Sequence, residues 1–242
     1  MHDPKESLCF ALDVPDRGAA SRLVGRLAGS VGMFKVGLEL FVKEGPDLLK
    51  ALADWGAKKI FLDLKFHDIP RTVLGACRSA SHLPVSFLSV HCEGLWEGQG
   101  KTERPAQAGG PEWLGITVLT SLGEPDLERL GYATGLSLTD LVLLRASIAK
   151  QAGCAGVVCS GREVRAIRER FGPSFVILAP GIRPEWSRVS EDDQSRIFTA
   201  HAAIREGADY VVIGRPIRDA PDPEEAARRI VEEIGRGYRD RG

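Results

Sequence analysis

The sequence contains the stretch Asp63-Leu64-Lys65-Phe66-His67-Asp68-Ile69-Pro70-Arg71-Thr72, which directly follows the apolar run Lys59–Leu62. The apolar run predicts a buried strand. Asp63 and Lys65 are two residues apart, so on an extended strand their side chains point to the same face. Charged groups at the end of a buried strand are costly to remove from water. We therefore expect them to neutralise one another and to serve a functional site at that end of the strand.

Short apolar runs alternate with longer amphipathic stretches along the whole chain. The short runs predict strands, and the longer stretches have the apolar spacing of helices. The predicted strands are Leu8–Leu12, Met33–Leu38, Ile60–Leu64, Val85–Val90, Gly115–Leu119, Gly156–Cys159, Phe175–Leu178 and Tyr210–Ile213. The predicted helices are Arg17–Gly29, Val42–Trp55, Thr72–His82, Leu138–Ala152, Gly161–Phe171, Phe198–Glu206 and Pro223–Ile234.

Strands that alternate with helices in this way predict an α/β fold, a closed parallel (β/α)8 TIM barrel, formed as a single domain by residues 1–242. An open doubly wound sheet is the alternative. Polar residues at or just after the predicted strand ends favour the barrel, because a barrel brings them to one mouth whereas an open sheet spreads them along a line. These residues are Asp13, Lys35, Asp63, Lys65, His91, Thr120, Ser160, Arg183 and Arg215.

The composition excludes several classes of function. The chain has 32 Lys and Arg against 33 Asp and Glu in 242 residues, which argues against a broad basic face for nucleic acid or an acidic membrane. No apolar run approaches membrane-spanning length, and the N-terminal residues lack the apolar core of a signal peptide. Five cysteines without a Cys-x-x-Cys pair indicate reduced, buried thiols. We expect a cytoplasmic protein.

The charged cluster is suited to proton donation. Acidic groups around Lys65 favour its charged form, and a protonated lysine held in a dry site can donate a proton and stabilise a neighbouring carbanion. Asp63 would repel a substrate carboxylate until CO2 departs. The same charges also suit a salt-bridge network that only fixes the barrel mouth. A magnesium site on Asp63 and Asp68 is disfavoured because Lys65 opposes a dication, and no His/Glu spacing predicts zinc or iron.

Two loops predict a phosphate site. Pro180–Arg183 follows the seventh predicted strand, and Val212–Pro216 ends the eighth, where barrels usually bind phosphate. Their glycines let backbone N–H groups approach an anion, and Arg183 and Arg215 can each bind phosphate oxygens with two donors. The polar loop Pro184–Asp193 is equally consistent with a lid over the ligand and with an ordinary solvated loop.

Together these motifs resemble orotidine 5'-phosphate decarboxylases of the short bacterial type, almost from end to end. The motif Asp63–Thr72 is highly specific, and the others are modest individually but occur in the expected order. They are Ala11-Leu12-Asp13, Lys35-Val36-Gly37, Val118-Leu119-Thr120-Ser121, Pro180-Gly181-Ile182-Arg183, Asp193-Gln194 and Gly214-Arg215-Pro216.

The resemblance implies conversion of orotidine 5'-monophosphate (OMP) to uridine 5'-monophosphate (UMP), the last step of de novo pyrimidine nucleotide synthesis, without metal or cofactor. By this analogy Lys65 gives its proton to C6 of the pyrimidine, and Asp63 lies beside the departing carboxylate. Asp13 and Lys35 hold the ribose and complete the charge array. The other implied binding residues are Thr120 at the base and Arg183, Gln194, Gly214 and Arg215 at the lid and phosphate.

The resemblance also implies a homodimer with shared active sites. In the family, the residues that match Asp68 and Thr72 reach into the site of the neighbouring subunit. The sequence departs from the family pattern after the fourth strand, where a glycine-rich turn usually precedes an amphipathic helix. Here the irregular segment Glu93–Trp113 follows instead. The fourth helix, and with it part of the subunit contact, is therefore not predicted.

Two other functions stay open at this point. The first is a Mg²⁺-dependent sugar-phosphate enzyme of the 3-keto-gulonate-phosphate decarboxylase or hexulose-phosphate synthase kind. Such enzymes resemble the chain in the Asp-x-Lys-x-x-Asp core but lack the continuation Ile69-Pro70-Arg71-Thr72. The second is a silent nucleotide-binding barrel. The intact row of charges argues against it, because binding alone does not require them.

Overall fold

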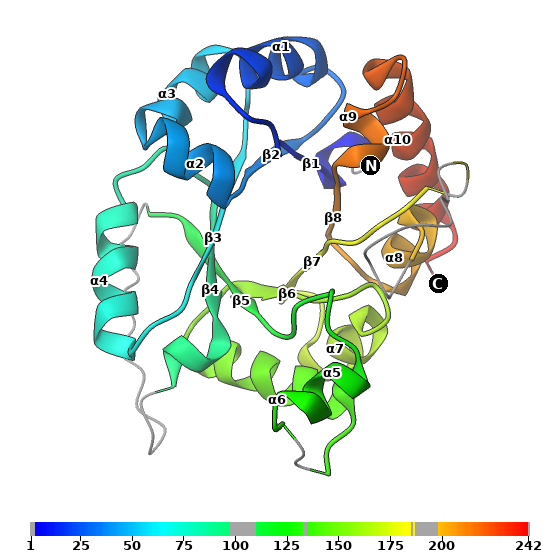
Figure 1. Cartoon of the computed structure of the whole chain (residues 1–242). Coiled ribbons are helices and arrows are strands. Elements are labelled where there is room, and N and C mark those ends of the chain that lie inside the picture. Colours follow the sequence, from blue (N-terminus) through cyan, green and yellow to red (C-terminus); the bar gives the residue numbers. More distant parts are fainter. Residues whose placement is uncertain (1–2, 97–109, 133–134, 185, 187–197, 242) are drawn as a thin grey trace.

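Eight parallel strands form a closed barrel in sequence order in the computed structural model (Figure 1). It describes residues 3–96, 110–132, 135–184, 186 and 198–241. The strands are β1 (Leu8–Ala11), β2 (Met33–Val36), β3 (Ile60–Phe66), β4 (Phe87–His91), β5 (Glu112–Ile116), β6 (Gly156–Val158), β7 (Val176–Ala179) and β8 (Tyr210–Ile213). Because β8 pairs with β1, the sheet has no free edge, which confirms the predicted TIM barrel and excludes an open sheet.

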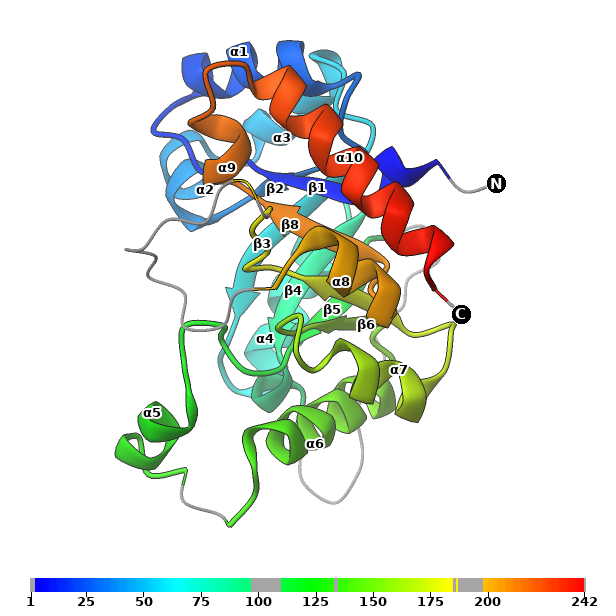
Figure 2. The same ribbon diagram turned by 90° about the vertical axis from the view of Figure 1, so that its right-hand side faces the viewer.

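Helices form a ring outside the barrel (Figure 1). They are α1 (Arg17–Leu27), α2 (Leu38–Glu44), α3 (Asp47–Asp54), α4 (Pro70–Ala80), α5 (Glu124–Arg129), α6 (Leu138–Gln151), α7 (Val164–Phe171), α8 (Ala200–Glu206), α9 (Arg215–Arg218) and α10 (Pro223–Arg239). Two short 3₁₀ helices, η1 (Pro4–Ser7) and η2 (Cys92–Leu95), complete the description. Figure 2 shows that α5 lies beyond one end of the barrel, away from the outer ring.

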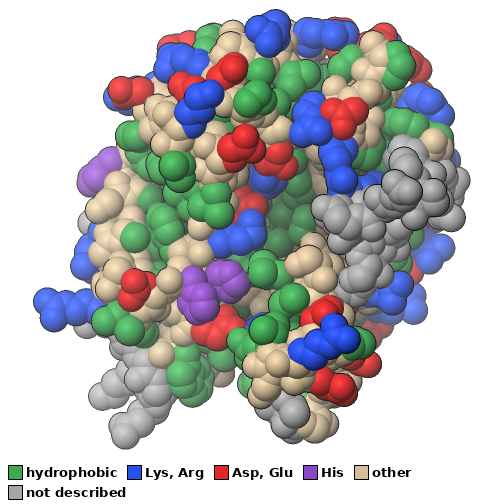
Figure 3. All heavy atoms as spheres, viewed as in Figure 1, with side chains coloured by type: hydrophobic (Ala, Val, Ile, Leu, Met, Phe, Trp, Pro, Cys, Tyr) green, Lys and Arg blue, Asp and Glu red, His purple; other side chains and the backbone are tan. Residues whose placement is uncertain are grey.

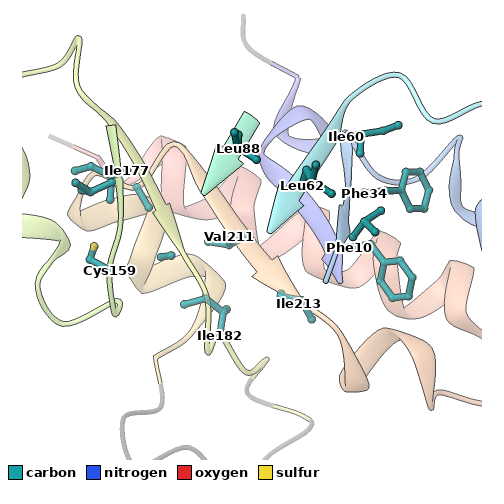
Figure 4. Close-up of a cluster of buried hydrophobic side chains, with 14 of the residues drawn as sticks. Phe10, Phe34, Ile60, Leu62, Leu88, Cys159, Ile177, Ile182, Val211 and Ile213 are labelled. Carbon is teal, nitrogen blue, oxygen red and sulfur yellow. The ribbon is translucent and has the colours of Figure 1, made fainter. Parts of the chain in front are cut away.

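Alternation along the strands separates two apolar cores. The larger core lies between the strands and the helices and includes the outward side chains Phe10, Phe34 and Leu62 (Figure 4). The smaller core fills the barrel interior, and its buried members are Cys9, Ala11, Met33, Phe61, Phe87, Leu114, Ile116, Val158, Leu178 and Val212. Inward positions further along the same strands carry polar side chains, so the interior is apolar at depth and charged at its mouth.

The structure corrects several predicted boundaries, and two of these corrections change how the elements are arranged. The predicted helix Val42–Trp55 is two helices, because Gly45 adopts φ +69° and Pro46 follows it, so α2 ends and α3 begins there. The fifth strand begins at Glu112, not Gly115, and pairs with β4 from Phe87 onward. The described ends of the irregular segment Glu93–Trp113 belong to η2 and to the start of β5.

Some predicted features fall outside the described residues. Gln194 and most of the proposed lid Pro184–Asp193 are among them, as are residues 97–109 of the irregular segment. All five cysteines are described, and each is a buried free thiol, as expected. None of the described helices combines the length and apolar character needed to cross a bilayer.

Close packing in the barrel interior leads to a stability prediction. A Cβ atom added to Gly156 would lie 1.9 Å from the carbonyl oxygen of Val176 on the paired strand. Gly156→Ala should therefore lower the free energy of unfolding by about 1–3 kcal/mol, measured by urea denaturation. The control is Gly25→Ala in α1, where an added Cβ meets nothing within 4 Å, so stability should rise by up to about 1 kcal/mol. An unchanged midpoint for Gly156→Ala would contradict this reading of the interior.

Candidate active site

A cavity of about 450 Å³ opens at the carboxyl ends of the strands. Acidic and basic side chains gather around a hollow on this face of the molecule (Figure 3). The barrel interior provides an apolar floor, and the polar wall comes from strand ends and from the loops after β5, β7 and β8. The apolar lining includes Ala11, Phe61, Ile116, Val158, Leu178 and Val212. A flat, partly apolar ligand with charged ends fits this distribution.

Four predicted residues form a continuous row of alternating charge along one wall of the cavity. Lys35 Nζ lies 3.0 Å from Asp13 Oδ1 and 3.8 Å from Asp63 Oδ2. Lys65 Nζ lies 2.7 Å from the same oxygen of Asp63. The row thus runs Asp13, Lys35, Asp63, Lys65, and its formal charges sum to zero.

Burial and the neighbouring carboxylates have opposite effects on the pKa of Lys35 in this row. The side chains of Lys35 and Asp63 are only 12% and 10% exposed, whereas Lys65 is 33% exposed at the cavity. Burial disfavours the charged form of Lys35, but the carboxylates of Asp63 and Asp13 outweigh it and raise the pKa of Lys35. The inner lysine therefore stays cationic and holds the two carboxylates, while the outer lysine faces the cavity.

The backbone that presents Lys65 is not a regular strand. Leu62 pairs with Leu88 and Phe66 pairs with Val90, so β3 carries two more residues than β4 over this interval. Lys65 has φ +50° and is the one described residue other than glycine with a positive φ, a conformation that costs about 1–2 kcal/mol. Simple alternation along an extended strand, which the sequence suggested, does not describe this pair, because Asp63 and Lys65 meet across a bulge.

Ser89 is a buried polar residue beside this bulge that the sequence analysis did not identify. Its Oγ accepts a hydrogen bond from the Lys65 backbone N–H at 2.9 Å and donates one to Asp63 Oδ1 at 2.8 Å. Both oxygens of Asp63 are therefore engaged, one by Ser89 and the other by the lysines. Its position two residues after the inward Phe87 is the signal that could have revealed it.

Asp68 and Thr72 do not line this cavity. Both are exposed, and the Asp68 carboxylate accepts a hydrogen bond from the backbone N–H of Ile69 at 2.6 Å. Thr72 lies in the first turn of α4. The Asp68 loop rests on η2, because a Cβ at Gly94 would lie 3.2 Å from the carbonyl oxygen of Asp68. The structure therefore brings four of the predicted charged residues together and leaves Asp68 on the outer surface.

Three arginines, Arg183, Arg215 and Arg218, also line the cavity. Arg183 follows Gly181, which has φ +76°, and its side chain is buried, with Nη1 donating to the carbonyl of Ile182. Arg215 begins α9 directly after Gly214. Gly181, Arg183, Gly214 and Arg215 all line the cavity. Arg218 was missed by the sequence analysis because it lies one helical turn further on. It donates to the carbonyl of Asp13 at 2.8 Å and pairs with Asp219.

Thr120 lies at the cavity as expected, in the segment after β5. This segment is held by Arg145 of α6, whose Nη1 donates to the carbonyl of Thr117 at 2.7 Å. Arg145 also pairs with Glu93 of η2, which in turn lies 3.7 Å from His91 Nδ1. Arg145 therefore links η2 to the segment that carries Thr120.

The rim of the cavity has no arrangement suited to a metal ion in the part of the chain that the structure describes. No group of three His, Cys, Asp or Glu side chains is placed to share an ion there. His67 and His91 stack on each other with ring centroids 4.6 Å apart. Asp63 is already engaged by two lysines and a hydroxyl.

Comparisons with known proteins show the family of the chain. A sequence model described as the orotidine 5'-phosphate decarboxylase / HUMPS family matches residues 6–230. Orotidine 5'-phosphate decarboxylase of Desulfosudis oleivorans is 47% identical over 234 residues, which cover 96% of this chain and 94% of the relative. The enzyme of the same name from Moorella thermoacetica is 46% identical over 247 residues, covering 97% of this chain and 94% of the relative.

Solved structures show the same architecture. The crystal structure of orotidine 5'-phosphate decarboxylase from Lactobacillus acidophilus superposes with a TM-score of 0.77 at 34% identity, covering 94% of this chain and 98% of that one. The corresponding structure from Pyrococcus horikoshii gives a TM-score of 0.73 at 25% identity, covering 94% and 99%. The resemblance inferred from the motifs is confirmed, and the chain belongs to the orotidine 5'-phosphate decarboxylase / HUMPS family.

Proposed function

We propose that this protein decarboxylates OMP to UMP without a metal ion or cofactor. The observation that carries the proposal is the row Asp13, Lys35, Asp63, Lys65 in a cavity that arginines also line. The relatives that share nearly the whole chain length carry the name of this activity. The strands β1 and β8 pair and close the barrel, which supports treating residues 1–242 as one catalytic domain.

The chemistry follows from the placement of the lysine and the acid. The substrate carboxylate would lie near Asp63, where two anions in a partly dry site repel each other. The bond from C6 to the carboxylate breaks, CO2 leaves, and the electron pair stays on C6. The ammonium group of Lys65, held 2.7 Å from Asp63, stabilises this pair and then transfers its proton to it. Lys35 keeps Asp63 compensated while Lys65 is neutral, and water then reprotonates Lys65.

The rest of the cavity suits the remaining parts of the nucleotide. The apolar floor would pack against the pyrimidine ring, with Thr120 at the base. Asp13 and Lys35 would hydrogen-bond the ribose. The phosphate would lie against Arg183, Gly214 and Arg215, with Gln194 assigned to the lid by the family resemblance alone.

We also propose a cytoplasmic homodimer in which Asp68 and Thr72 complete the site of the partner subunit. Both side chains are exposed and lie outside the cavity of their own subunit. Ile69, which lies between them in the sequence, is 67% exposed, so apolar surface accompanies the two polar residues. Five buried free thiols suit a reducing compartment.

The Mg²⁺-dependent sugar-phosphate enzymes are the nearest rival. The family description joins the decarboxylase to a second group, HUMPS, so that match alone does not choose between them. The continuation Ile69-Pro70-Arg71-Thr72 and the names of the relatives favour OMP. A silent nucleotide-binding barrel would not need Lys65 beside Asp63.

Turnover of OMP tests the function directly. Purified protein mixed with OMP should show the change in ultraviolet absorbance that accompanies UMP formation, and excess chelator should leave the rate unchanged. Lys65→Ala should lower kcat by about 10²- to 10⁴-fold, because the proton donor is gone, while the circular dichroism spectrum keeps its native form. Loss of turnover with chelator would favour the rival class, and full activity of Lys65→Ala would remove the proposed donor.

Binding of UMP and uridine separates phosphate recognition from recognition of the rest of the ligand. Arg215→Ala should weaken UMP binding by about 10- to 100-fold, because a charge-assisted hydrogen bond contributes about 1.5–3 kcal/mol, and should change uridine affinity little. Titration calorimetry measures both. Arg228→Ala, an exposed arginine on α10, is the control and should change neither. Equal losses for both ligands would show that Arg215 does not contact phosphate.

Mixed dimers test the shared site. Asp68→Ala and Lys65→Ala homodimers each carry a defect in every site, so both should be nearly inactive. After subunit exchange, half of the dimers are mixed and each has one intact site, so activity should return to about a quarter of wild type. Differently tagged subunits show by co-purification that mixed dimers have formed. If mixed dimers form and stay inactive, Asp68 does not act across the interface.

A further inference from the structure

Ser89 occupies a position that the proposed reaction mechanism does not explain. The residue lies on β4, its side chain is fully buried, and it is not among the residues that line the cavity. It nevertheless contacts both members of the pair that faces the substrate, the Asp63 carboxylate and the Lys65 backbone. A serine on an apolar strand would ordinarily satisfy a single neighbouring backbone group.

The Ser89 hydroxyl accepts one hydrogen bond and donates another, and the direction of each bond is fixed by its partner. The backbone N–H of Lys65 can only donate, so Ser89 Oγ accepts this bond at 2.9 Å. The single hydroxyl proton is then directed to Asp63 Oδ1 at 2.8 Å, since an ionised carboxylate can only accept. Ser89 therefore links the acid and the lysine through bonds whose directions cannot be exchanged.

The Lys65 backbone needs such a link. Two extra residues of β3 are accommodated between the pairs Leu62–Leu88 and Phe66–Val90, and Lys65 takes φ +50° within this bulge. The N–H of a bulged residue is displaced from the regular ladder and has to find another acceptor. Ser89 lies between the two paired β4 residues, Leu88 and Val90, and supplies that acceptor.

The Asp63 carboxylate needs the link as well. Its Oδ2 receives Lys65 Nζ at 2.7 Å and lies 3.8 Å from Lys35 Nζ. Holding Oδ1 with a hydrogen bond fixes the rotation of the carboxylate about its Cβ–Cγ bond. The hydrogen bond from Ser89 therefore sets the direction of Oδ2 and, with it, the position of the Lys65 ammonium group.

We propose that Ser89 is a positioning residue for the decarboxylation. One buried hydroxyl holds the bulge that presents Lys65 and sets the rotation of Asp63, so that the ammonium points to the substrate carbon. This inference rests on the proposed function, because its kinetic consequence needs the reaction. A misplacement of about 1 Å in a reacting group can lower a rate by about 10²-fold, which makes a positioning role measurable.

Kinetics and binding of Ser89→Ala test the inference. We expect kcat for OMP to fall by about 10- to 100-fold while the dissociation constant of UMP changes by less than about 3-fold. Hydrogen exchange of the backbone amides in Leu62–Phe66 should become faster, because the Lys65 N–H loses its acceptor. Ser89→Thr, which keeps the hydroxyl, should restore most of kcat. A kcat within about 3-fold of wild type for Ser89→Ala overturns the inference.

Ser7→Ala is the matched control. Ser7 is equally buried, its Oγ hydrogen-bonds Tyr238 Oη at 2.6 Å, and it precedes β1 at the opposite end of the barrel. It should lower thermal stability without lowering kcat. Parallel falls in kcat, UMP affinity and stability for Ser89→Ala would show a structural role only. If Ser89→Ala does not fold, Ser89→Cys, with its weaker donor, is judged by the same criteria.

Failure of the inference and failure of the proposed function are distinguishable. Wild-type protein without OMP turnover would remove the function, whereas hydrogen exchange would still report whether Ser89 holds the Lys65 backbone. Turnover by wild type together with an unchanged kcat and unchanged exchange in Ser89→Ala would remove the inference alone.

Discussion

The ion pair between Asp63 and Lys65 is the interaction on which the site depends. It places an ammonium group at the mouth of the barrel. The neighbouring charged groups balance its charge, and a neighbouring hydroxyl holds the pair in position. Lys35 and Asp13 extend it into a neutral row, and Ser89 fixes it to the adjacent strand. Neutrality is important because unpaired charges at this depth would be strongly disfavoured. The closed sheet in turn keeps three consecutive strand ends close enough for the row to form.

Much of the site follows from local sequence because TIM barrels place strand ends at one mouth. Asp13, Lys35 and Asp63 could be placed together from their positions after apolar runs, and Arg183 and Arg215 from the loops where barrels bind phosphate. The strand boundaries were accurate where β-branched runs were bounded by clear breaks. Gly45 and Pro46 signal the break between α2 and α3, but the helical apolar spacing on both sides of them led to the prediction of one continuous helix.

The missed features depend on contacts between strands. The positive φ of Lys65 has no local signal, since neither glycine nor asparagine marks it, and it is imposed by the register between β3 and β4. The contacts of Ser89 with Asp63 and Lys65 can be inferred only once that register is known. β5 was misplaced because charged and proline residues precede it, whereas pairing with β4 from Phe87 determines where it begins. Such tertiary effects routinely override sequence pattern.

The contact of Gly94 with the Asp68 loop has a consequence for the proposed dimer. Val73 Cγ2 lies 3.1 Å and the Asp68 carbonyl 3.2 Å from where a Cβ would stand, so the loop is buttressed from within its own chain. Assembly through Asp68 would then join two preformed surfaces as rigid bodies. Little conformational entropy would be lost on association, so the pairing strength would depend mainly on complementarity between the facing surfaces.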